Sequence, residues 1–416
     1  MTPSSLHRFL DDAAPALALT PAGERLPPAL ALRDRCRHEG IAIASLGPFY
    51  RALAAGRIAP LTIPAFNLRG LTYDLARALW RTALRCDAGP LIFELSPSES
   101  HAGDQDFAEF VALVCAAAVR EGYRGPIFCQ GDHLRTAAAG AADIESLCRA
   151  AITAGMWQID IDAAANPAGN PAVTAAAVAL VRSLAPAGAD VMLGGEVGVI
   201  GGQNTTAADI GAFWHDFQAA LPAGAPGLGK ISVQTGTRHG GLVREDGSIE
   251  PMPLDVPLIA ALSQVARHEF GLPGIVQHGA STLTLGQLAQ LPGAGAVEVH
   301  LATALQNLLF DHPAFPSPLR QQMMAALAAE AAAEAEGGDY AHAGAAGLTP
   351  AQQFYHQRWR AWGMFKPELW NLPPPLRQTL AAGCEAWFED VFRALGLAGR
   401  GEDMRALYPD NEGTMP

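Results

Sequence analysis

Short apolar runs alternate with Ala- and Leu-rich stretches of helical length between Leu61 and Thr303. Eight of these runs are predicted to be strands, namely Leu61–Asn67, Pro90–Ser96, Pro126–His133, Met156–Asp162, Asp190–Gly198, Lys230–Thr237, Gly274–Ser281 and Ala296–Thr303. Helices are expected between them over Tyr73–Cys86, Phe107–Glu121, Ile144–Ala154, Ala172–Leu184, Ile210–Leu221, Leu258–Glu269 and Thr284–Gln290. A helix in every gap between eight strands predicts an α/β fold of the (β/α)₈ TIM-barrel type. An open doubly wound sheet is the alternative, and the lack of GxGxxG after the first strand weakens its dinucleotide-binding form.

The sequence before and after the alternating strands and helices lacks this alternation. We expect an N-terminal helical segment over residues 1–57, a catalytic barrel over 58–315 and a C-terminal helical extension over 316–416. Within the extension, Gln321–Gly337 is predicted to be a helix, and the Gly- and Ala-rich Gly338–Gly347 to be a mobile loop. Tyr355–Leu397 carries four Trp at helical spacing, so we expect it to pack on the barrel or on a second subunit.

Composition narrows the class of protein. Of the 416 residues, 50% are hydrophobic, so the chain can bury a large core. A net charge of -13 argues against a protein whose main task is to bind nucleic acid. The six cysteines form no CxxC pair and are interpreted as reduced thiols. No secretory signal or membrane span is visible, so a cytoplasmic location is expected.

Metal-capable residues recur where the predicted strands end. His133 ends the third strand, Glu196 lies at the end of the fifth, His239 follows the sixth and His278 lies at the end of the seventh. Catalytic groups of a barrel project from the carboxyl ends of its strands, so these side chains are expected to converge. Three imidazoles with an open position are typical of catalytic zinc, although Co²⁺, Mn²⁺ or Fe²⁺ would suit the same ligands. Isolated surface or core histidines are the alternative interpretation.

Several motifs together resemble the class II, metal-dependent fructose- and tagatose-bisphosphate aldolases. They are Pro64-Ala65-Phe66-Asn67, Gly131-Asp132-His133, Gly195-Glu196 with Gly201-Gly202, Thr237 to Gly240, His278-Gly279-Ala280-Ser281 and Phe365 to Trp370. The ordered set spans Thr62 to Leu309, the length expected of such a barrel.

The resemblance implies a role for each of these residues. His133, His239 and His278 would bind Zn²⁺, or another divalent ion such as Co²⁺ or Mn²⁺, with Glu196 as a further or alternative ligand. Asp132 would exchange a proton with the substrate at the bond being cleaved. The implied reaction is reversible aldol cleavage of a phosphorylated ketose through a metal-stabilised enediolate. Only two lysines are present, which fits a metal mechanism better than a Schiff-base mechanism.

A second group of residues is implied to bind the substrate. Its members are Asn67, Ser96, Gly240, Gly279, Ser281, His300 and Thr303. Glycine amides with the Ser/Thr set near strands six to eight would hold phosphate, and Ser96 would lie near the other end of the substrate. Ordinary capping of strand ends is an equally good explanation for Ser96, Ser281 and Thr303.

The chain departs from the family pattern in its substrate-binding part. The family's Asn-x-Asp-Thr after strand eight is His300-Leu301-Ala302-Thr303 here, and its acidic mobile loop is Gln203-Asn204-Thr205-Thr206. The His that opens the Asp-His motif in the fructose branch is Gln130. These changes indicate a substrate other than fructose-1,6-bisphosphate, or a weakened catalyst. The alternatives are a non-catalytic aldolase-like subunit and another metal-dependent barrel enzyme such as a hydrolase. A homo-oligomer, most simply a dimer, is expected, with no nucleic acid or membrane partner.

Overall fold

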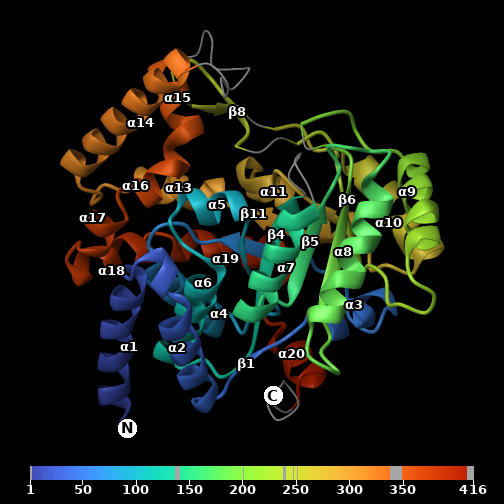
Figure 1. Cartoon of the computed structure of the whole chain (residues 1–416), viewed down its shortest axis with the longest axis horizontal. Coiled ribbons are helices and arrows are strands. Elements are labelled where there is room, and N and C mark those ends of the chain that lie inside the picture. Colours follow the sequence, from blue (N-terminus) through green and yellow to red (C-terminus); the bar gives the residue numbers. More distant parts are fainter. Residues whose placement is uncertain are drawn as a thin grey trace.

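Eight parallel strands form a closed barrel (Figure 1) in the computed structural model, which describes residues 2–135, 141–199, 201–237, 240–246, 248–250, 252–337 and 349–409. The barrel strands are β2 (Ile63–Asn67), β3 (Ile92–Leu95), β4 (Gly125–Arg135), β5 (Gln158–Asp162), β6 (Met192–Val197), β7 (Lys230–Val233), β10 (Ile275–Gln277) and β11 (Ala296–Leu301). Because β4 pairs with both β3 and β5, the ring has no open edge. The predicted TIM barrel is confirmed, and the open sheet is excluded.

Helices follow the barrel strands along the chain. They are α4 (Thr72–Arg85), α6 (Phe107–Arg120), α7 (Ala141–Ala154), α8 (Asn170–Leu184), α9 (Ala207–Ala220), α10 (Val256–Phe270), α11 (Leu285–Leu288), α12 (Leu291–Ala294) and α13 (Thr303–Phe310). The first seven of these correspond to the predicted helices, and the last two, α12 and α13, are not predicted. The apolar helix α6 is almost wholly buried, since α1 (Pro3–Ala18) and α2 (Leu26–His38) cover its outer side. Asp106 caps α6 by accepting a hydrogen bond from the amide of Glu109.

The N-terminal segment also contains a strand that the sequence does not predict. β1 (Ile41–Ile43) runs parallel to the first residues of β4, before the point where β5 begins to pair with β4. The following helix, α3 (Gly47–Ala54), packs into the N-terminal end of the barrel. Its Phe49 and Tyr50 are buried in one apolar cluster with interior residues such as Ile92. This segment therefore closes the barrel from below.

Three short elements decorate the carboxyl ends of the strands. α5 (Pro97–Ala102) follows β3, and Ser96 and Glu99 form a capping box at its start. β8 (Leu242–Val243) and β9 (Ile249–Glu250) form an antiparallel hairpin after β7. The 3₁₀ turn η2 (Ala280–Thr282) follows β10. The sequence pattern predicts none of the three, because each is too short to show a period.

The C-terminal extension packs on the barrel (Figure 1). It comprises α14 (Ser317–Gly337), α15 (Pro350–Gln357), η3 (Arg358–Arg360), α16 (Ala361–Met364), α17 (Lys366–Trp370), α18 (Pro374–Ala382), α19 (Glu385–Ala394) and α20 (Gly401–Leu407). Trp362, Trp370 and Phe388 are buried within the core, so the first of the two predicted locations is correct. The predicted loop Gly338–Gly347 lies outside the described residues.

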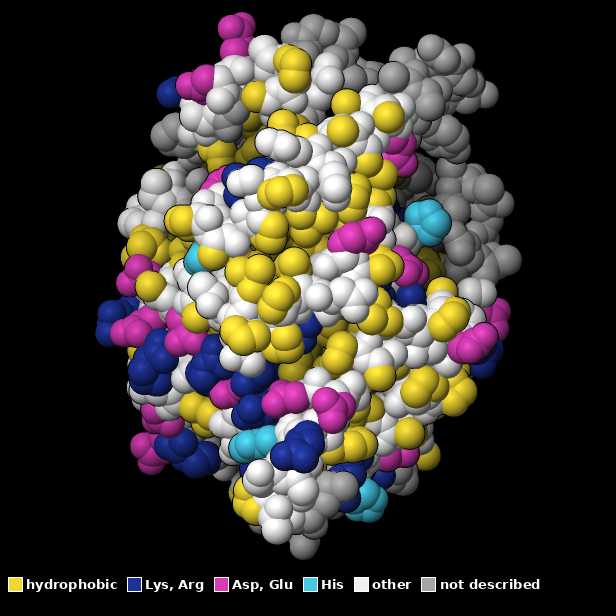
Figure 2. Space-filling model, turned by 90° about the vertical axis from the view of Figure 1, so that its left-hand side faces the viewer, with side chains coloured by type: hydrophobic (Ala, Val, Ile, Leu, Met, Phe, Trp, Pro, Cys, Tyr) yellow, Lys and Arg dark blue, Asp and Glu magenta, His cyan; other side chains and the backbone are white. Residues whose placement is uncertain are grey.

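One face of the molecule divides into an apolar and a charged part. Figure 2 shows hydrophobic side chains gathered over its upper and middle region and charged side chains below them. The exposed methionines Met324 and Met364 belong to the C-terminal extension. Among the helices that the structure describes, none has both the length and the apolar composition that a membrane crossing requires.

Candidate active site

A β-bulge at the end of β4 turns two successive side chains into the mouth of the barrel. The pairing of β4 with β5 shifts register between Gly131 and Leu134, and His133 has a φ of 46°. Successive side chains of a regular strand point to opposite faces, but Asp132 and His133 here line the same cavity. A residue with a side chain adopts such a left-handed φ at an energetic cost, which is typical of functional positions.

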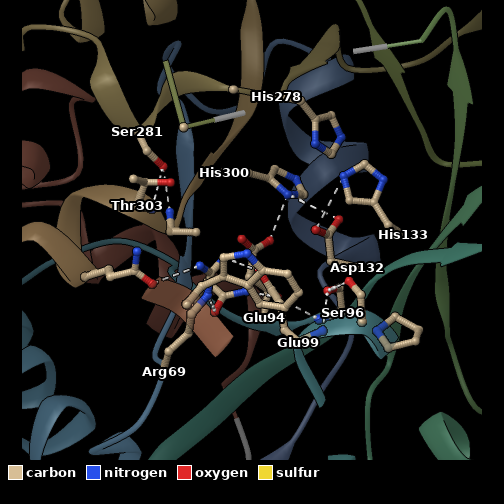
Figure 3. A pocket seen from close by; sticks show the side chains of 18 of the residues that line it. Arg69, Glu94, Ser96, Glu99, Asp132, His133, His278, Ser281, His300 and Thr303 are labelled. Carbon is tan, nitrogen blue, oxygen red and sulfur yellow. Dashed lines mark hydrogen bonds and ion pairs between the residues drawn. The ribbon is translucent and has the colours of Figure 1, made fainter. Parts of the chain in front are cut away.

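His133 belongs to a buried group of imidazoles and carboxylates, and Figure 3 shows it beside His278 and Asp132. Its Nδ1 is 3.0 Å from Glu196 Oε2 and 3.2 Å from Asp162 Oδ2, and its Nε2 is 3.7 Å from Asp132 Oδ2. The rings of His133 and His278 lie 4.6 Å apart. Burial alone would lower the pKa of His133, but the carboxylates of Asp132 and Glu196 raise it well above its ordinary value.

The donors in this group fit a divalent metal ion. Ligand atoms of Asp132, His133 and His278 lie within 4.8 Å of one another, and so do those of His133, Asp162 and Glu196. Imidazole nitrogen and carboxylate oxygen together suit zinc, and they also suit cobalt or manganese. Of the four predicted ligands, His133 therefore lies close to His278 in one group and to Glu196 in the other. The fourth, His239, lies outside the described residues.

His300 brings another imidazole to the barrel mouth from β11. Its ring lies 4.1 Å from that of His278. Its Nδ1 is 2.8 Å from Glu94 Oε2 and 3.3 Å from Asp132 Oδ1, and its Nε2 is 2.9 Å from Glu298 Oε1. Burial alone would lower the pKa of His300, but the carboxylates of Glu94 and Asp132 raise it well above its ordinary value. A protonated His300 can therefore offset the charge of the neighbouring carboxylates.

A cavity of about 530 Å³ opens above these residues, a size that suits a small-molecule substrate. All seven predicted substrate-binding residues line it, namely Asn67, Ser96, Gly240, Gly279, Ser281, His300 and Thr303. Asp132, His133 and His278 lie on its wall as well. Figure 3 shows Ser281 and Thr303 on one side of the three imidazoles and Arg69 farther away.

Ser281 has a structural task in addition to any contact with substrate. Its Oγ accepts hydrogen bonds from the amides of Ala302, at 2.7 Å, and Thr303, at 3.1 Å, and so caps the start of α13. Ser281 therefore has a capping role, at the start of a helix, whether or not it also contacts a substrate. Gly279 has a φ of 67°, which glycine adopts without strain, and this turn brings the chain from β10 to Ser281.

The C-terminal extension contributes part of the cavity wall. Tyr355, His356 and Trp359 line it together with the barrel residues. Tyr355 donates a hydrogen bond of 3.0 Å to the carbonyl oxygen of Gly240, and Gln352 donates one of 2.8 Å to that of Val243. Helix α15 therefore holds the loop that follows β7, which is the loop carrying the predicted ligand His239.

Below the cavity, a charged network fills the barrel interior. Lys230 is fully buried, and its Nζ lies 2.6 Å from Gln130 Oε1, 2.6 Å from Glu298 Oε1 and 3.0 Å from Asp160 Oδ2. Tyr50 donates a hydrogen bond to Glu298 from the side of α3. Since Glu298 also contacts His300, the network links the barrel floor to the active site.

Five residues in and below the site are not predicted from the sequence, namely Glu94, Asp160, Asp162, Glu298 and Lys230. A signal for two of them is present, because Gln158-Ile159-Asp160-Ile161-Asp162 alternates polar and apolar residues within a predicted barrel strand. Such alternation indicates that one face of the strand is polar, and in a closed barrel the interior is that face. No comparable pattern marks Glu94, which lies in an apolar run.

Comparison with known proteins identifies the family. A family model described as fructose-bisphosphate aldolase class-II matches residues 51–348. The chain therefore belongs to the class II fructose-bisphosphate aldolase family, as the motifs in the sequence suggest. Class II aldolases are metal-dependent, which agrees with the cluster of histidines and carboxylates at the barrel mouth.

Solved structures with the same fold share little sequence with this chain. The YdjI aldolase from Escherichia coli K12 is 14% identical with a TM-score of 0.52, and the match covers 86% of this chain and 99% of that one. A probable tagatose 6 phosphate kinase from Sinorhizobium meliloti 1021 is 18% identical with a TM-score of 0.57, over 83% and 100%. Fructose-bisphosphate aldolase from Campylobacter jejuni is 17% identical with a TM-score of 0.50, over 86% and 97%. At such low identity these matches show the fold, and the chain is a divergent family member.

Proposed function

We propose that the protein is a zinc-dependent aldolase that reversibly cleaves a phosphorylated ketose. The observation that carries the proposal is the position of Asp132 next to the imidazoles of His133 and His278 on the wall of the cavity. His133, His278 and His239 would hold the ion, with Glu196 as a further ligand. A bound divalent ion supplies Lewis-acid stabilisation of the negative charge that develops beside a ketone when a carbon–carbon bond breaks.

Asp132 is suited to take the proton of the substrate hydroxyl at the bond being cleaved. Burial would raise the pKa of Asp132, but His133 and His300 hold it well below the usual range, so the carboxylate is ionised at neutral pH. In the reverse direction, aldol addition, the same carboxyl would return the proton to the new hydroxyl. The cavity wall around Asp132 is buried, so little water competes for its oxygens.

The phosphate group would bind where the loops after β7 and β10 meet the start of α13. Gly240 and Gly279 have left-handed backbones and bring their peptide groups close to the cavity. Ser281 accepts both amides with its oxygen and still has its hydroxyl proton to donate. The N-terminus of α13 adds a favourable dipole for an anion.

Metal analysis and a substrate screen test this proposal together. The purified protein should contain close to one zinc per chain, and it should cleave at least one phosphorylated ketose. Chelation should abolish cleavage, and zinc should restore it. His133→Ala should lose both metal and activity, whereas Asp132→Ala should keep the metal and lose cleavage. Full activity in the presence of a chelator would contradict the proposal. Metal without cleavage of any ketose would favour a different metal-dependent reaction.

We also propose that two copies associate through the C-terminal extension. Support comes from Met324 and Met364 of this extension, which are large apolar side chains that the single chain leaves exposed, as is typical of residues at subunit contacts. Light scattering of the purified protein would distinguish a dimer from a monomer. Met364→Glu should shift a dimer toward the monomer.

A further inference from the structure

The cavity contains an arginine, Arg69, whose charge is already balanced by a neighbouring carboxylate. Arg69 lies away from the imidazole cluster (Figure 3). Its Nε donates to Asn67 Oδ1 at 3.1 Å, its Nη1 donates to Gln306 Oε1 at 3.4 Å, and its Nη2 forms an ion pair with Glu99. Each of the three nitrogens thus already has an oxygen partner within the protein. An arginine that binds phosphate directs two parallel N–H groups and an unbalanced positive charge at the anion, whereas the Nη2 of Arg69 is bonded to Glu99.

Glu99 is itself held in place, so the ion pair is a built feature. Its carboxylate accepts hydrogen bonds from the side chain of Asn67 and, at 3.1 Å, from the amide of Ser96 at the start of α5. The side chains of Arg69 and Glu99 are only 15% and 14% exposed. In so shielded a place the negative charge of Glu99 is weakly screened, and it would repel a phosphate brought to Arg69.

The other basic side chains that line the cavity add no unbalanced charge, since burial and the nearby Arg358 lower the pKa of His356 below its ordinary value. Arg135 lines the cavity and donates to Asp162 at 2.6 Å. The two lysines lie elsewhere, with Lys230 inside the barrel and Lys366 paired with Glu109 at 2.8 Å. Within the described part of the chain, this end of the cavity therefore has no surplus positive charge for a dianion.

The polar groups at the end of the cavity around Arg69 suit the hydroxyl groups of a substrate. Ser98 lines it with a hydroxyl, and Asn67 and Gln306, whose amide oxygens accept from Arg69, each keep an amide N–H that can donate to a substrate hydroxyl. Trp359 of the C-terminal extension lies next to Arg69 and Glu99 and offers an indole ring, which packs well on the C–H face of a sugar.

We propose that the region formed by Asn67, Arg69, Glu99, Gln306 and Trp359, here called the distal subsite, binds the uncharged polyol end of the substrate. The preferred substrate is then a ketose that carries a single phosphate, on the carbon next to the ketone, and not a bisphosphate. This inference rests on the proposed aldol reaction for its chemistry, but the selectivity of the distal subsite is measurable without cleavage.

The wild-type zinc enzyme provides the first test. Steady-state kinetics would compare kcat/KM for ketohexose 1-phosphates and the matching 1,6-bisphosphates. We expect a ratio of bisphosphate to monophosphate below about 0.1, the effect of one partly screened like-charge contact. A ratio of one or more would overturn the proposal, and so would a preference for unphosphorylated ketoses.

Hexitol phosphates separate the subsite from the reaction, because they have no ketone and are not cleaved. Calorimetry should show that the wild-type protein binds hexitol 1-phosphate more tightly than hexitol 1,6-bisphosphate. If no ketose is cleaved but this order of affinities holds, the aldol function fails and the distal subsite stands. If ketoses are cleaved but the order is reversed, the aldol function stands and the distal subsite fails.

Glu99→Gln provides the second test. Glutamine is accepted at this position of a capping box, so α5 should keep its start while the charge is lost. The variant should raise the ratio of bisphosphate to monophosphate, in both kcat/KM and binding, about tenfold by freeing the charge of Arg69. Glu368→Gln, on the exposed side of α17, is the matched control and should leave the ratio unchanged. An unchanged ratio in folded Glu99→Gln would refute the role of the ion pair.

Discussion

Replacement of Lys230 by methionine tests the electrostatics of the barrel interior. Lys230 is fully buried between Asp160 and Glu298, and methionine keeps most of its volume but not its charge. Removing one partner of a buried ion pair destabilises a protein by about 3–5 kcal/mol, because the other charge is left uncompensated. For 416 residues the entropy of unfolding is about 0.9 kcal/mol/K, at about 2.1 cal/mol/K per residue. A loss of about 4 kcal/mol should therefore lower Tm by about 5 °C at pH 7.

The pH dependence separates this explanation from simple repacking. Without Lys230, burial should raise the native pKa of both Asp160 and Glu298 above the values of the unfolded chain. The native state then binds more protons than the unfolded state, so the variant loses stability as pH rises from about 5 to 8. The difference in Tm between wild type and Lys230→Met should therefore be larger at pH 8 than at pH 5, as measured by calorimetry.

The second lysine offers a matched control. Lys366 is also buried against a carboxylate, Glu109, but Arg25 lies 3.4 Å from the same carboxylate and can compensate for it. Lys366→Met should therefore cost less than Lys230→Met. If Lys230→Met melts within 1 °C of wild type at pH 7, or if the difference does not change with pH, the charged interior is not the stabilising feature described above.

Three further changes have defined outcomes. Burial raises the pKa of Glu109 above its ordinary value, to about 7. Its ionisation therefore lowers the free energy of unfolding as pH rises from about 4.5 to 7. Glu109→Gln should flatten this decline when the free energy is measured by urea unfolding across that pH range. A steeper decline in the variant would be inconsistent with this. Gly363→Ala should lower Tm because its Cβ would lie 2.2 Å from the carbonyl oxygen of Ala102, whereas Gly211→Ala, with open space around it, should be neutral or slightly stabilising. Equal melting of the two alanine variants would show that the extension tolerates the contact. Asp132→Asn should retain its bound zinc, as measured by mass spectrometry. Its kcat should fall at least about a hundredfold, which is the usual contribution of a general base. Near-normal turnover would show that Asp132 takes no part in the reaction.

The sequence predicts the barrel well because each barrel strand leaves its own pattern in a few consecutive residues. A buried parallel strand reads as a short apolar run between helices, and the run Met156–Asp162 falls on β5 (Gln158–Asp162). β1 (Ile41–Ile43) escapes detection since its three residues are too few to show a period, and its partner lies far along the chain at Gly125. Such pairings depend on tertiary structure alone.

The candidate site is predictable to the extent that strand ends converge. This rule brings together Asp132, His133 and His278, and it also places His300 on the cavity wall. It does not predict the left-handed backbone of His133, because a bulge depends on the register with β5 and not on local preference. Nor does it indicate that Glu94 Oε2 lies 2.8 Å from His300 Nδ1, since a side chain near a strand end can face the barrel interior or the surrounding helices.

The wall of the cavity is built from two stretches of the polypeptide, the barrel and the C-terminal extension. The family model ends at residue 348, yet Tyr355 and Trp359 border the same chamber as Asp132. Substitutions downstream of that boundary would therefore alter the cavity wall without touching Asp132 or the histidines of the barrel. A polypeptide that ended at residue 348 would lack the part of the cavity wall that Tyr355, His356 and Trp359 supply.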